Sequence, residues 1–197
     1  MKRILFTLLS SALLAVVHDA QSVTFRGKVE DVSGTNNLFF VDCTSTQLTS
    51  LAFNLNSFVG QQVAITGDWN GSFAAPSVNV TSIAPALETY EIGGGADIGD
   101  FSNQSFVAAP GTFAVGLLSL GSSFAPFQGG NGVIFLDPTR VVLTQTGVVG
   151  GSGILEIPFF IPNDPALIGI DLIGQGALLS AGAAPLLTNP DCKEIDD

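Results

Sequence analysis

Histidine is almost absent from this chain of 197 residues, which contains only His18. That histidine lies within residues 1–22, a segment with the pattern of a secretory signal, so the exported protein would contain no imidazole. Imidazole is the side chain that most often performs acid–base chemistry, activates serine or cysteine nucleophiles and binds zinc. Its absence disfavours the common hydrolase and zinc-enzyme classes.

The signal assignment depends on three features of the N-terminal segment. Lys2 and Arg3 form a basic start, and residues 4–17 form an uncharged run too short to span a bilayer. Ala20, Gln21 and Ser22 then supply the small, any, small pattern of a cleavage site. We expect cleavage after Ser22 and a secreted, periplasmic or cell-surface protein with no transmembrane segment left. Cleavage after Ala20 is the alternative, although it would put His18 where a small residue is preferred.

Basic residues are also scarce. Removing Lys2, Arg3 and Asp19 with the signal leaves four basic and sixteen acidic side chains, so the net charge changes from -11 to -12. Nucleic acid is excluded as an expected partner, because phosphate binding requires clustered cations. The acidic surface indicates a soluble protein. The four cations that remain are Arg26, Lys28, Arg140 and Lys193.

Cysteine occurs twice, at positions 43 and 192. In an oxidising compartment we expect Cys43 and Cys192 to form one intramolecular disulfide, with unpaired or intermolecular thiols as the alternative. Neither cysteine belongs to a Cys-x-x-Cys motif, and no cysteine lies at the signal junction. Redox catalysis, a clustered metal site and lipid anchoring are therefore unsupported, and we predict no metal and no cofactor.

The first half of the mature chain predicts a small β-barrel. Charged residues make up only 12% of the chain, and 23 glycines divide short runs such as 63–69, in which apolar residues alternate. Five such runs lie in residues 23–86. The segments Arg26-Gly27-Lys28-Val29-Glu30, Phe39-Phe40-Val41-Asp42 and 58–69 resemble small bacterial OB-type domains. This resemblance implies a fold rather than a ligand.

The second half predicts an antiparallel β-sandwich. The segment around Pro85 has no strong periodicity, so we place a domain boundary near Ala86. Turn residues beyond it separate further strand-like runs, which indicates a sandwich over residues 87–185 and an acidic C-terminal tail over 186–197. The predicted fold class is all-β, an OB-like barrel followed by a sandwich. The runs are 104–109, 112–120, 133–137, 140–144, 153–161 and 168–179.

A second resemblance covers about half of the chain. It rests on the aliphatic strand in 150–158, the turn Ile161-Pro162-Asn163-Asp164-Pro165, the Leu167-Ile168-Gly169 step, and residues 94–99 upstream. These features resemble a C-terminal β domain that recurs in secreted proteins of planctomycetes and related environmental bacteria. The resemblance implies export and a β-sandwich, but no chemistry. This chain departs from the family's usual order, in which the domain closes a much longer protein.

Carboxylates are the remaining candidates for catalysis. A glycoside hydrolase needs only two of them, but nearly all of these aspartates adjoin glycine, proline or a strand end, where capping a turn is the ordinary role. We therefore expect no enzymatic activity and name no catalytic residue. Asp97 with Asp100, or Asp164 with Asp171, could share a calcium ion, although no calcium-binding repeat is present. The candidates are Asp42, Asp68, Asp97, Asp100, Asp164 and Asp171.

Aromatic residues give the best indication of a ligand site. OB-type barrels bind oligosaccharides or single strands through exposed aromatics, although core filling explains most aromatics in a small barrel. Trp69 and Phe73 are the predicted ligand-binding residues because they flank the Asn70-Gly71 turn. We expect a secreted binding or surface-associated module, with a polysaccharide or a cell-surface protein as partner. The alternative is a structural, self-associating surface protein, which exposed edge strands would favour.

Overall fold

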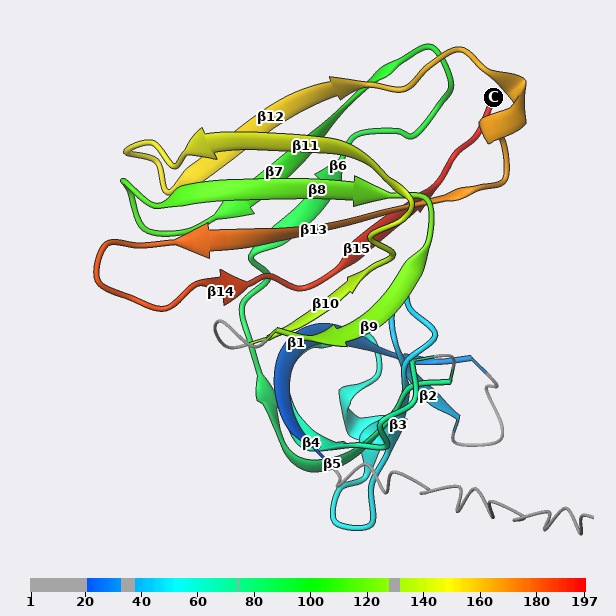
Figure 1. Ribbon diagram of the computed structural model, residues 1–197, viewed down its shortest axis with the longest axis vertical. Helices are drawn as coiled ribbons and strands as arrows, with labels where there is room; N and C mark the ends of the chain where they lie inside the picture. The colour runs from blue at the N-terminus through cyan, green and yellow to red at the C-terminus, as the bar shows by residue number, and fades with distance from the viewer. Residues whose placement is uncertain (1–20, 33–37, 74, 128–131) are drawn as a thin grey trace, which may run out of the picture.

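The computed structural model describes residues 21–32, 38–73, 75–127 and 132–197 (Figure 1). The predicted signal segment lies outside the described residues, apart from Gln21 and Ser22, which begin the first strand. The fold is all-β, with a closed five-stranded barrel joined to antiparallel sheets, and this confirms the predicted fold class.

The barrel closes in the strand order β1-β2-β3-β5-β4. Neighbouring strands are antiparallel except β3 and β5, which are parallel. A short 3-10 helix, η1 (Leu55–Phe58), precedes β4. Apolar side chains alternate along β4, so that Val63, Ile65 and Trp69 face the interior. The strands are β1 (Gln21–Asp31), β2 (Phe39–Val41), β3 (Gln47–Thr49), β4 (Gln62–Trp69) and β5 (Ser77–Pro85).

The sandwich consists of two antiparallel sheets. One has the order β12-β7-β6, and the other has β11-β8-β13-β14, with β15 also paired to β13. The residues that the sequence indicates as an acidic tail form β14 and β15 instead, and Ile195 is buried. The elements are β6 (Tyr90–Gly93), β7 (Phe101–Val107), β8 (Phe113–Ser119), β11 (Val141–Val148), β12 (Ile154–Phe160), η2 (Pro165–Leu167), β13 (Asp171–Leu179), β14 (Leu186–Leu187) and β15 (Asp191–Glu194).

Glycines in one sheet make room for the largest side chains of the other. Tyr90 and Phe106 are fully buried and point toward β8 and β13. A β-carbon at Gly116 would lie 2.8 Å from the Phe106 ring, and one at Gly174 would lie 2.8 Å from the Tyr90 ring. Glycine within a strand is otherwise unfavourable, so these positions are explained by the close approach of the two rings.

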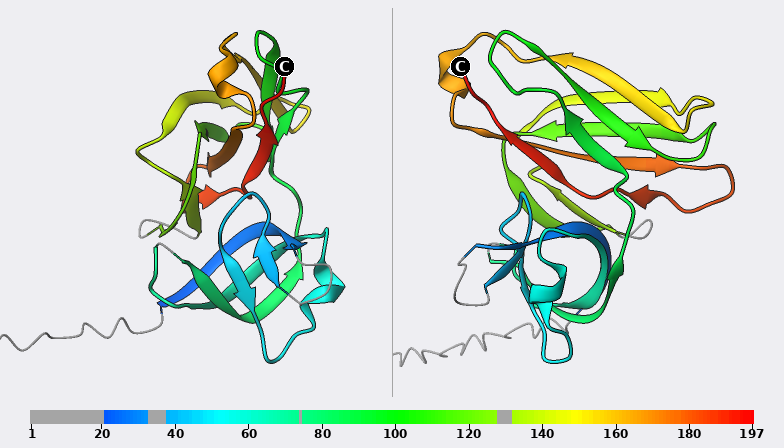
Figure 2. Two further views of the ribbon diagram at one scale, coloured as in Figure 1. Left: turned by 90° about the vertical axis from the view of Figure 1, so that its right-hand side faces the viewer. Right: turned by 180° about the vertical axis from the view of Figure 1, so that it is seen from behind.

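A single long hairpin connects the sandwich to the barrel. β8 bends into β9 (Ser122–Pro126), and β10 (Val133–Leu136) bends into β11. Because β8 pairs with β11 while β9 pairs with β10, residues 113–127 and 132–148 form the two arms of one hairpin, and the outer half of these arms leaves the sandwich. Figures 1 and 2 show this outer half between the sandwich and the barrel.

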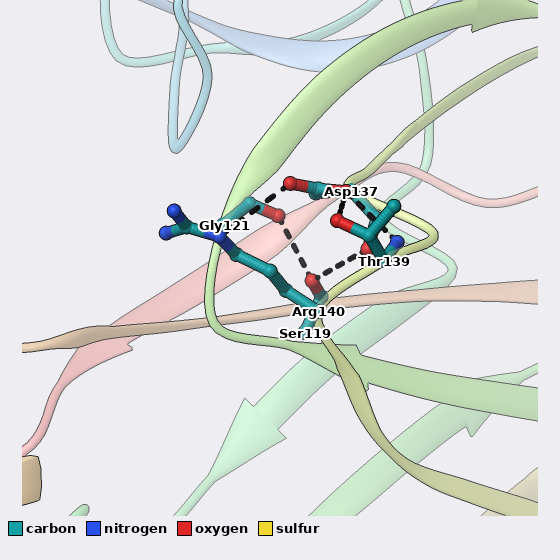
Figure 3. A network of polar contacts seen from close by, with 5 residues as sticks. All are labelled: Ser119, Gly121, Asp137, Thr139 and Arg140. Atoms are coloured by element: carbon teal, nitrogen blue, oxygen red, sulfur yellow. Dashed lines mark hydrogen bonds and ion pairs between the residues drawn. The ribbon is translucent and has the colours of Figure 1, made fainter.

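Polar contacts fix the bend of this hairpin (Figure 3). Asp137 Oδ1 accepts hydrogen bonds from Thr139 N at 2.9 Å and from Thr139 Oγ1 at 2.7 Å. These bonds hold the pKa of Asp137 below its ordinary value. Arg140 Nε lies 3.6 Å from Asp137 Oδ2, and Ser119 Oγ lies 3.0 Å from the Gly121 carbonyl oxygen and 3.1 Å from that of Asp137. The two strands therefore turn together at one defined corner.

The outer half of the hairpin completes the barrel core. Phe124 and Phe135 are fully buried, and their rings lie 5.2 Å from Trp69 and 5.4 Å from Phe25, respectively. Gln175 on β13 holds the hairpin from the other side, because its side chain accepts a hydrogen bond from Phe135 N at 2.9 Å. One apolar core thus continues across the predicted boundary near Ala86. Independent folding of the two segments stays a prediction.

A disulfide provides a second connection between barrel and sandwich. Cys43, just after β2, is joined to Cys192 on β15, with a Cα–Cα distance of 5.5 Å. Cys43 has a φ of 67°, an uncommon conformation for a residue other than glycine. Beside it, Lys28 Nζ lies 3.2 Å from Asp42 Oδ2.

Candidate functional site

A cleft of about 360 Å³ lies beside β3 on the barrel. Its walls come from β2, β3, the segment between β3 and η1, and the start of η1. None of the lining residues is charged. They are Phe39, Gln47, Leu48, Thr49, Ser50, Phe53, Asn54, Leu55 and Asn56.

Local hydrogen bonds shape the loop that forms one wall of this cleft. Ser50 Oγ accepts from Phe53 N at 3.0 Å and lies 3.2 Å from the Val80 carbonyl oxygen, which joins the loop to β5. Asn54 then caps η1, because its Oδ1 accepts from Asn56 N at 3.2 Å. The loop is held by its own polar groups, so the cleft is preformed.

Gln47 is a side chain in this cleft that is available for a ligand. Its amide is half-buried and has no hydrogen-bond partner among the described residues. A carboxamide has an NH₂ group that donates hydrogen bonds and an oxygen that accepts them, so it can donate to a hydroxyl or accept from one. The partly buried Phe53 ring lines the same cleft and provides an apolar surface. The cleft therefore combines neutral polar groups with aromatic surface.

The two predicted ligand-binding residues lie together but differ in exposure. Trp69 is only 3% exposed, and its ring lies 4.9 Å from that of Phe73 and 5.2 Å from that of Phe124. Its Nε1 donates a hydrogen bond to the Ser72 carbonyl at 3.2 Å. Phe73 is 62% exposed. The structure thus leaves a free aromatic face at Phe73, whereas the indole of Trp69 is part of the core.

The β4–β5 loop that carries Phe73 lies against the start of β3. Asn70 organises this loop, because its Oδ1 accepts from Ser72 N at 3.1 Å and from Ser77 N at 3.2 Å. The Pro76 carbonyl accepts a hydrogen bond from Gln47 N at 3.0 Å. The loop and the polar cleft therefore meet at the same end of β3. Neither Gln47 nor the cleft is apparent from sequence, because β3 is only three residues long.

Three of the candidate carboxylates have structural partners. Asp42 pairs with Lys28, Asp100 Oδ1 accepts from Phe101 N at 3.3 Å, and Asp164 caps η2 by accepting from Ala166 N at 3.0 Å. These contacts are the ordinary roles of aspartate at turns and caps.

Among the described residues, one group of three possible metal ligands has its ligand atoms within 4.8 Å of one another, namely Asp42, Cys43 and Cys192. Both sulfur atoms are in the disulfide, so this group provides a single carboxylate. The aspartates that sequence analysis pairs for calcium do not belong to such a group, and we make no calcium proposal.

The acidic groups with raised pKa values lie where β6 meets β15. Asp191 Oδ2 accepts a hydrogen bond from Ile92 N at 2.7 Å, and burial raises the pKa of its carboxyl group. Burial, followed by repulsion from Glu91 and Asp191, also raises the pKa of Glu88. The buried Tyr90 hydroxyl donates to Gln104 Oε1 at 3.0 Å, and burial raises its pKa well above the ordinary value. These groups join β-strands and line none of the clefts found on the barrel.

Two further findings bear on function. Among the residues that the structure describes, no helix is long and apolar enough to cross a membrane. No protein-family model, curated protein or solved structure matches this chain.

Proposed function

We propose that this protein is an exported, non-catalytic module that binds a neutral polysaccharide in the cleft beside β3. The observation that carries the proposal is the composition of that cleft, in which the unpartnered amide of Gln47 lies near the ring of Phe53 and no lining residue is charged. Sugar hydroxyls both donate and accept hydrogen bonds, which suits amides, and sugar rings have apolar faces that suit aromatic surface. The net charge of -12 after signal removal disfavours anionic polysaccharides.

The position of the cleft supports the same function. In OB-type barrels, oligosaccharides and oligonucleotides bind over β2 and β3 and the loops between β1 and β2 and between β4 and β5. Here the cleft includes Phe39 of β2 and Gln47 of β3, and Phe73 projects from the β4–β5 loop. The shortage of lysine and arginine argues against oligonucleotides, because their phosphates require cations.

The chemistry of the cleft also supports the non-catalytic part of the proposal. Glycoside hydrolysis requires two carboxyl groups about 5 to 10 Å apart on either side of the scissile bond. The lining residues of this cleft include no aspartate or glutamate. We therefore expect no turnover of any polysaccharide that binds. Hydrolysis that a single aspartate substitution abolishes would contradict this expectation.

A glycan panel on the mature protein, followed by calorimetry on the best ligand, tests the site. Gln47→Ala removes an amide that makes no internal hydrogen bond, so affinity is expected to fall about fivefold to tenfold while the fold is kept. Asn163→Ala is the control, since Asn163 is exposed on the sandwich and its amide also has no hydrogen-bond partner among the described residues. If no neutral glycan binds, or Gln47→Ala binds as the wild type does, the proposal fails.

Phe73 is the aromatic residue that can be tested cleanly. Stacking on an aromatic ring contributes roughly 1 to 3 kcal/mol where bases have been measured, so Phe73→Ala should weaken binding at least fivefold. Phe101→Ala on the sandwich, 70% exposed, is the control. Trp69→Ala is a poor test, because truncating a buried tryptophan costs about 3 to 5 kcal/mol of stability. Unchanged binding by Phe73→Ala would show that this ring lies outside the ligand path.

Export is tested separately by N-terminal sequencing of secreted protein. The sequence pattern predicts a start at Val23, with Gln21 as the alternative. In the structure, β1 begins at Gln21, and its first two residues pair with Trp69 and Asp68. Both are exposed, so cleavage after Ser22 shortens β1 without opening the core. Intact Met1 in the extracellular fraction would contradict the signal assignment.

A further inference from the structure

The β11 strand is a sheet edge whose one irregularity is a β-bulge between Val141 and Leu143, so its pairing with β8 is regular from Leu143 to Val148. β11 and β12 are the edge strands of the two sandwich sheets. β12 carries Glu156 and Pro158, and the Pro158 carbonyl accepts a hydrogen bond from Gln145 Nε2 at 2.8 Å. The eight residues of β11 include neither a charged residue nor a proline. Native proteins generally protect such edges, because the unpaired N–H and C=O groups are a template for another strand.

The exposed face of β11 has the same pattern when it is read from either end. Its outward residues are Thr144, Thr146 and Val148, together with Val142 at the bulge; all four are exposed, and the two valines are 55% and 57% exposed. Gln145 lies at the centre of this pattern. A strand with this symmetry is complementary to itself in the antiparallel direction.

We propose that β11 pairs antiparallel with β11 of a second copy of the chain, around a two-fold axis at Gln145. Val142 then lies opposite Val148 of the second copy, and Thr144 lies opposite Thr146. Such β-branched and threonine pairs are favourable across antiparallel strands. The two residue numbers in each pair are both even or both odd. Backbone N–H and C=O groups point to the same side of a strand at every second residue, so the groups that point away from β8 in one copy face those of the other. The contact is isologous, as a two-fold dimer requires.

Charge explains why two copies meet at this strand. A net charge of -12 on each mature chain opposes self-association over most of the surface, whereas β11 brings no acid to the contact. The nearest charged residue before β11 in the sequence is Arg140, whose Nε is already 3.6 Å from Asp137 Oδ2. On the neighbouring strand, Phe113 pairs with Val148 and is 41% exposed, which extends the uncharged surface.

The sandwich is incompletely closed on the β11 side. On the opposite side, Asn189 Oδ1 accepts from Thr89 N at 2.9 Å, so the edge of β6 is covered. On the β11 side the inward-facing Leu143 and Leu155 are only half-buried. An apolar cleft of about 210 Å³ also opens there, and it is lined by residues of β11 and β12. A strand added to β11 extends the sheet beside this opening and shields Leu143 from solvent.

Sedimentation of the mature protein tests the dimer at concentrations up to about 1 mM, where even small interfaces associate. The double variant Thr144→Lys/Thr146→Lys places like charges opposite one another twice, so dimerisation should weaken at least tenfold. The double variant Thr144→Lys/Thr146→Glu places opposite charges in the same pairs and should restore it. Val107→Lys, at a 47% exposed site on β7, should leave the dimer unchanged.

Spin labels measure the register directly. Labels at position 142 in the two copies should be about 20 Å apart, because six residues of strand separate the paired positions. A protein that stays monomeric, a dimer that survives the Lys/Lys pair, or a Lys/Glu variant as monomeric as Lys/Lys would overturn the proposal. Capture of a different protein by β11 without self-association would also overturn it. The glycan assay uses other residues, so its failure is distinguishable from failure here.

Discussion

Replacing Phe124 with alanine is the most direct test of how the two halves of the molecule depend on each other. Phe124 belongs to β9, yet its ring is fully buried in the barrel core, 5.2 Å from Trp69 and 6.3 Å from Phe25. A ring of the same hairpin, that of Phe135, lies 5.8 Å away. Phe124→Ala therefore removes the side chain that the hairpin contributes at the centre of this cluster.

The expected cost is large relative to the stability of the protein. Truncating a buried phenylalanine to alanine typically costs about 3 to 5 kcal/mol, out of a total free energy of unfolding of about 5 to 15 kcal/mol. For a chain of this size, each kcal/mol corresponds to about 2 to 4 °C, so the melting temperature should fall by about 6 to 20 °C. Phe73→Ala, which removes an exposed ring in contact with the same tryptophan, should cost less than about 1.5 kcal/mol.

The chain carries its own probes for the assay. Trp69 is its only tryptophan and lies in the barrel core, and Tyr90 is its only tyrosine and lies in the sandwich core. Tryptophan fluorescence and near-ultraviolet circular dichroism of tyrosine should give one common unfolding midpoint. In Phe124→Ala both midpoints should shift together, because one hairpin belongs to both cores.

Two outcomes would refute this reasoning. One is a wild-type protein whose two probes have separate midpoints, and the other is a Phe124→Ala variant as stable as Phe73→Ala. The sequence boundary near Ala86 leads to the contrary expectation, that residues 23–86 and 87–197 each unfold cooperatively when expressed alone. Expression of 23–86 with and without the hairpin residues decides between the two. Cooperative unfolding of 23–86 by itself would show that the barrel folds without β9 and β10.

Three further predictions concern charge, covalent connection and packing. Because burial raises the pKa of Asp191, the folded state binds its proton more tightly than the unfolded state, so this residue lowers stability as pH rises above about 4. Urea unfolding of Asp191→Asn should therefore show a smaller loss of unfolding free energy with rising pH than the wild type does. An identical pH dependence in the two proteins would contradict the raised pKa. Replacing both Cys43 and Cys192 with serine should cost at most about 5 kcal/mol in the chain-entropy model, and two free thiols found by non-reducing mass mapping of fresh protein would argue against the bridge. Gly174→Ala should cost about 1 to 3 kcal/mol by thermal unfolding, since its β-carbon would overlap the buried tyrosine ring, and a neutral result would mean that the facing sheet can move away.

Alternation and turn residues predict most of the strands. The run 112–120 corresponds to β8, 153–161 to β12 and 168–179 to β13, each within three residues at either end. Local pattern was sufficient there because the turns between these runs contain glycine or proline, and β8 and β12 also alternate between more and less exposed residues, whereas β13 has five consecutive buried residues. β9 has no such pattern, since it ends in proline and is held by the barrel rather than by its own sequence.

The site was harder to predict because it depends on contacts between distant residues. Trp69 is on the same face of β4 as the buried Val63 and Ile65, so the alternation along this strand indicates that it points inward. The ring that packs on it, Phe124, comes from a distant strand that local sequence cannot specify. The cleft beside β3 arises from hydrogen bonds of Ser50 and Asn54, whose partners no periodicity identifies. The C-terminal residues form β15 because β13 offers an edge, despite their acidic composition.

The long bent hairpin also determines when the molecule can finish folding. The barrel strands are made first, but their core stays incomplete until Phe135 reaches Phe25. The disulfide closes still later, because its two cysteines are 149 residues apart in sequence. Contacts of such long range slow folding, since loop closure must precede the gain from packing. The barrel of a growing chain therefore remains open, with Trp69 accessible, until β9 and β10 have been synthesised.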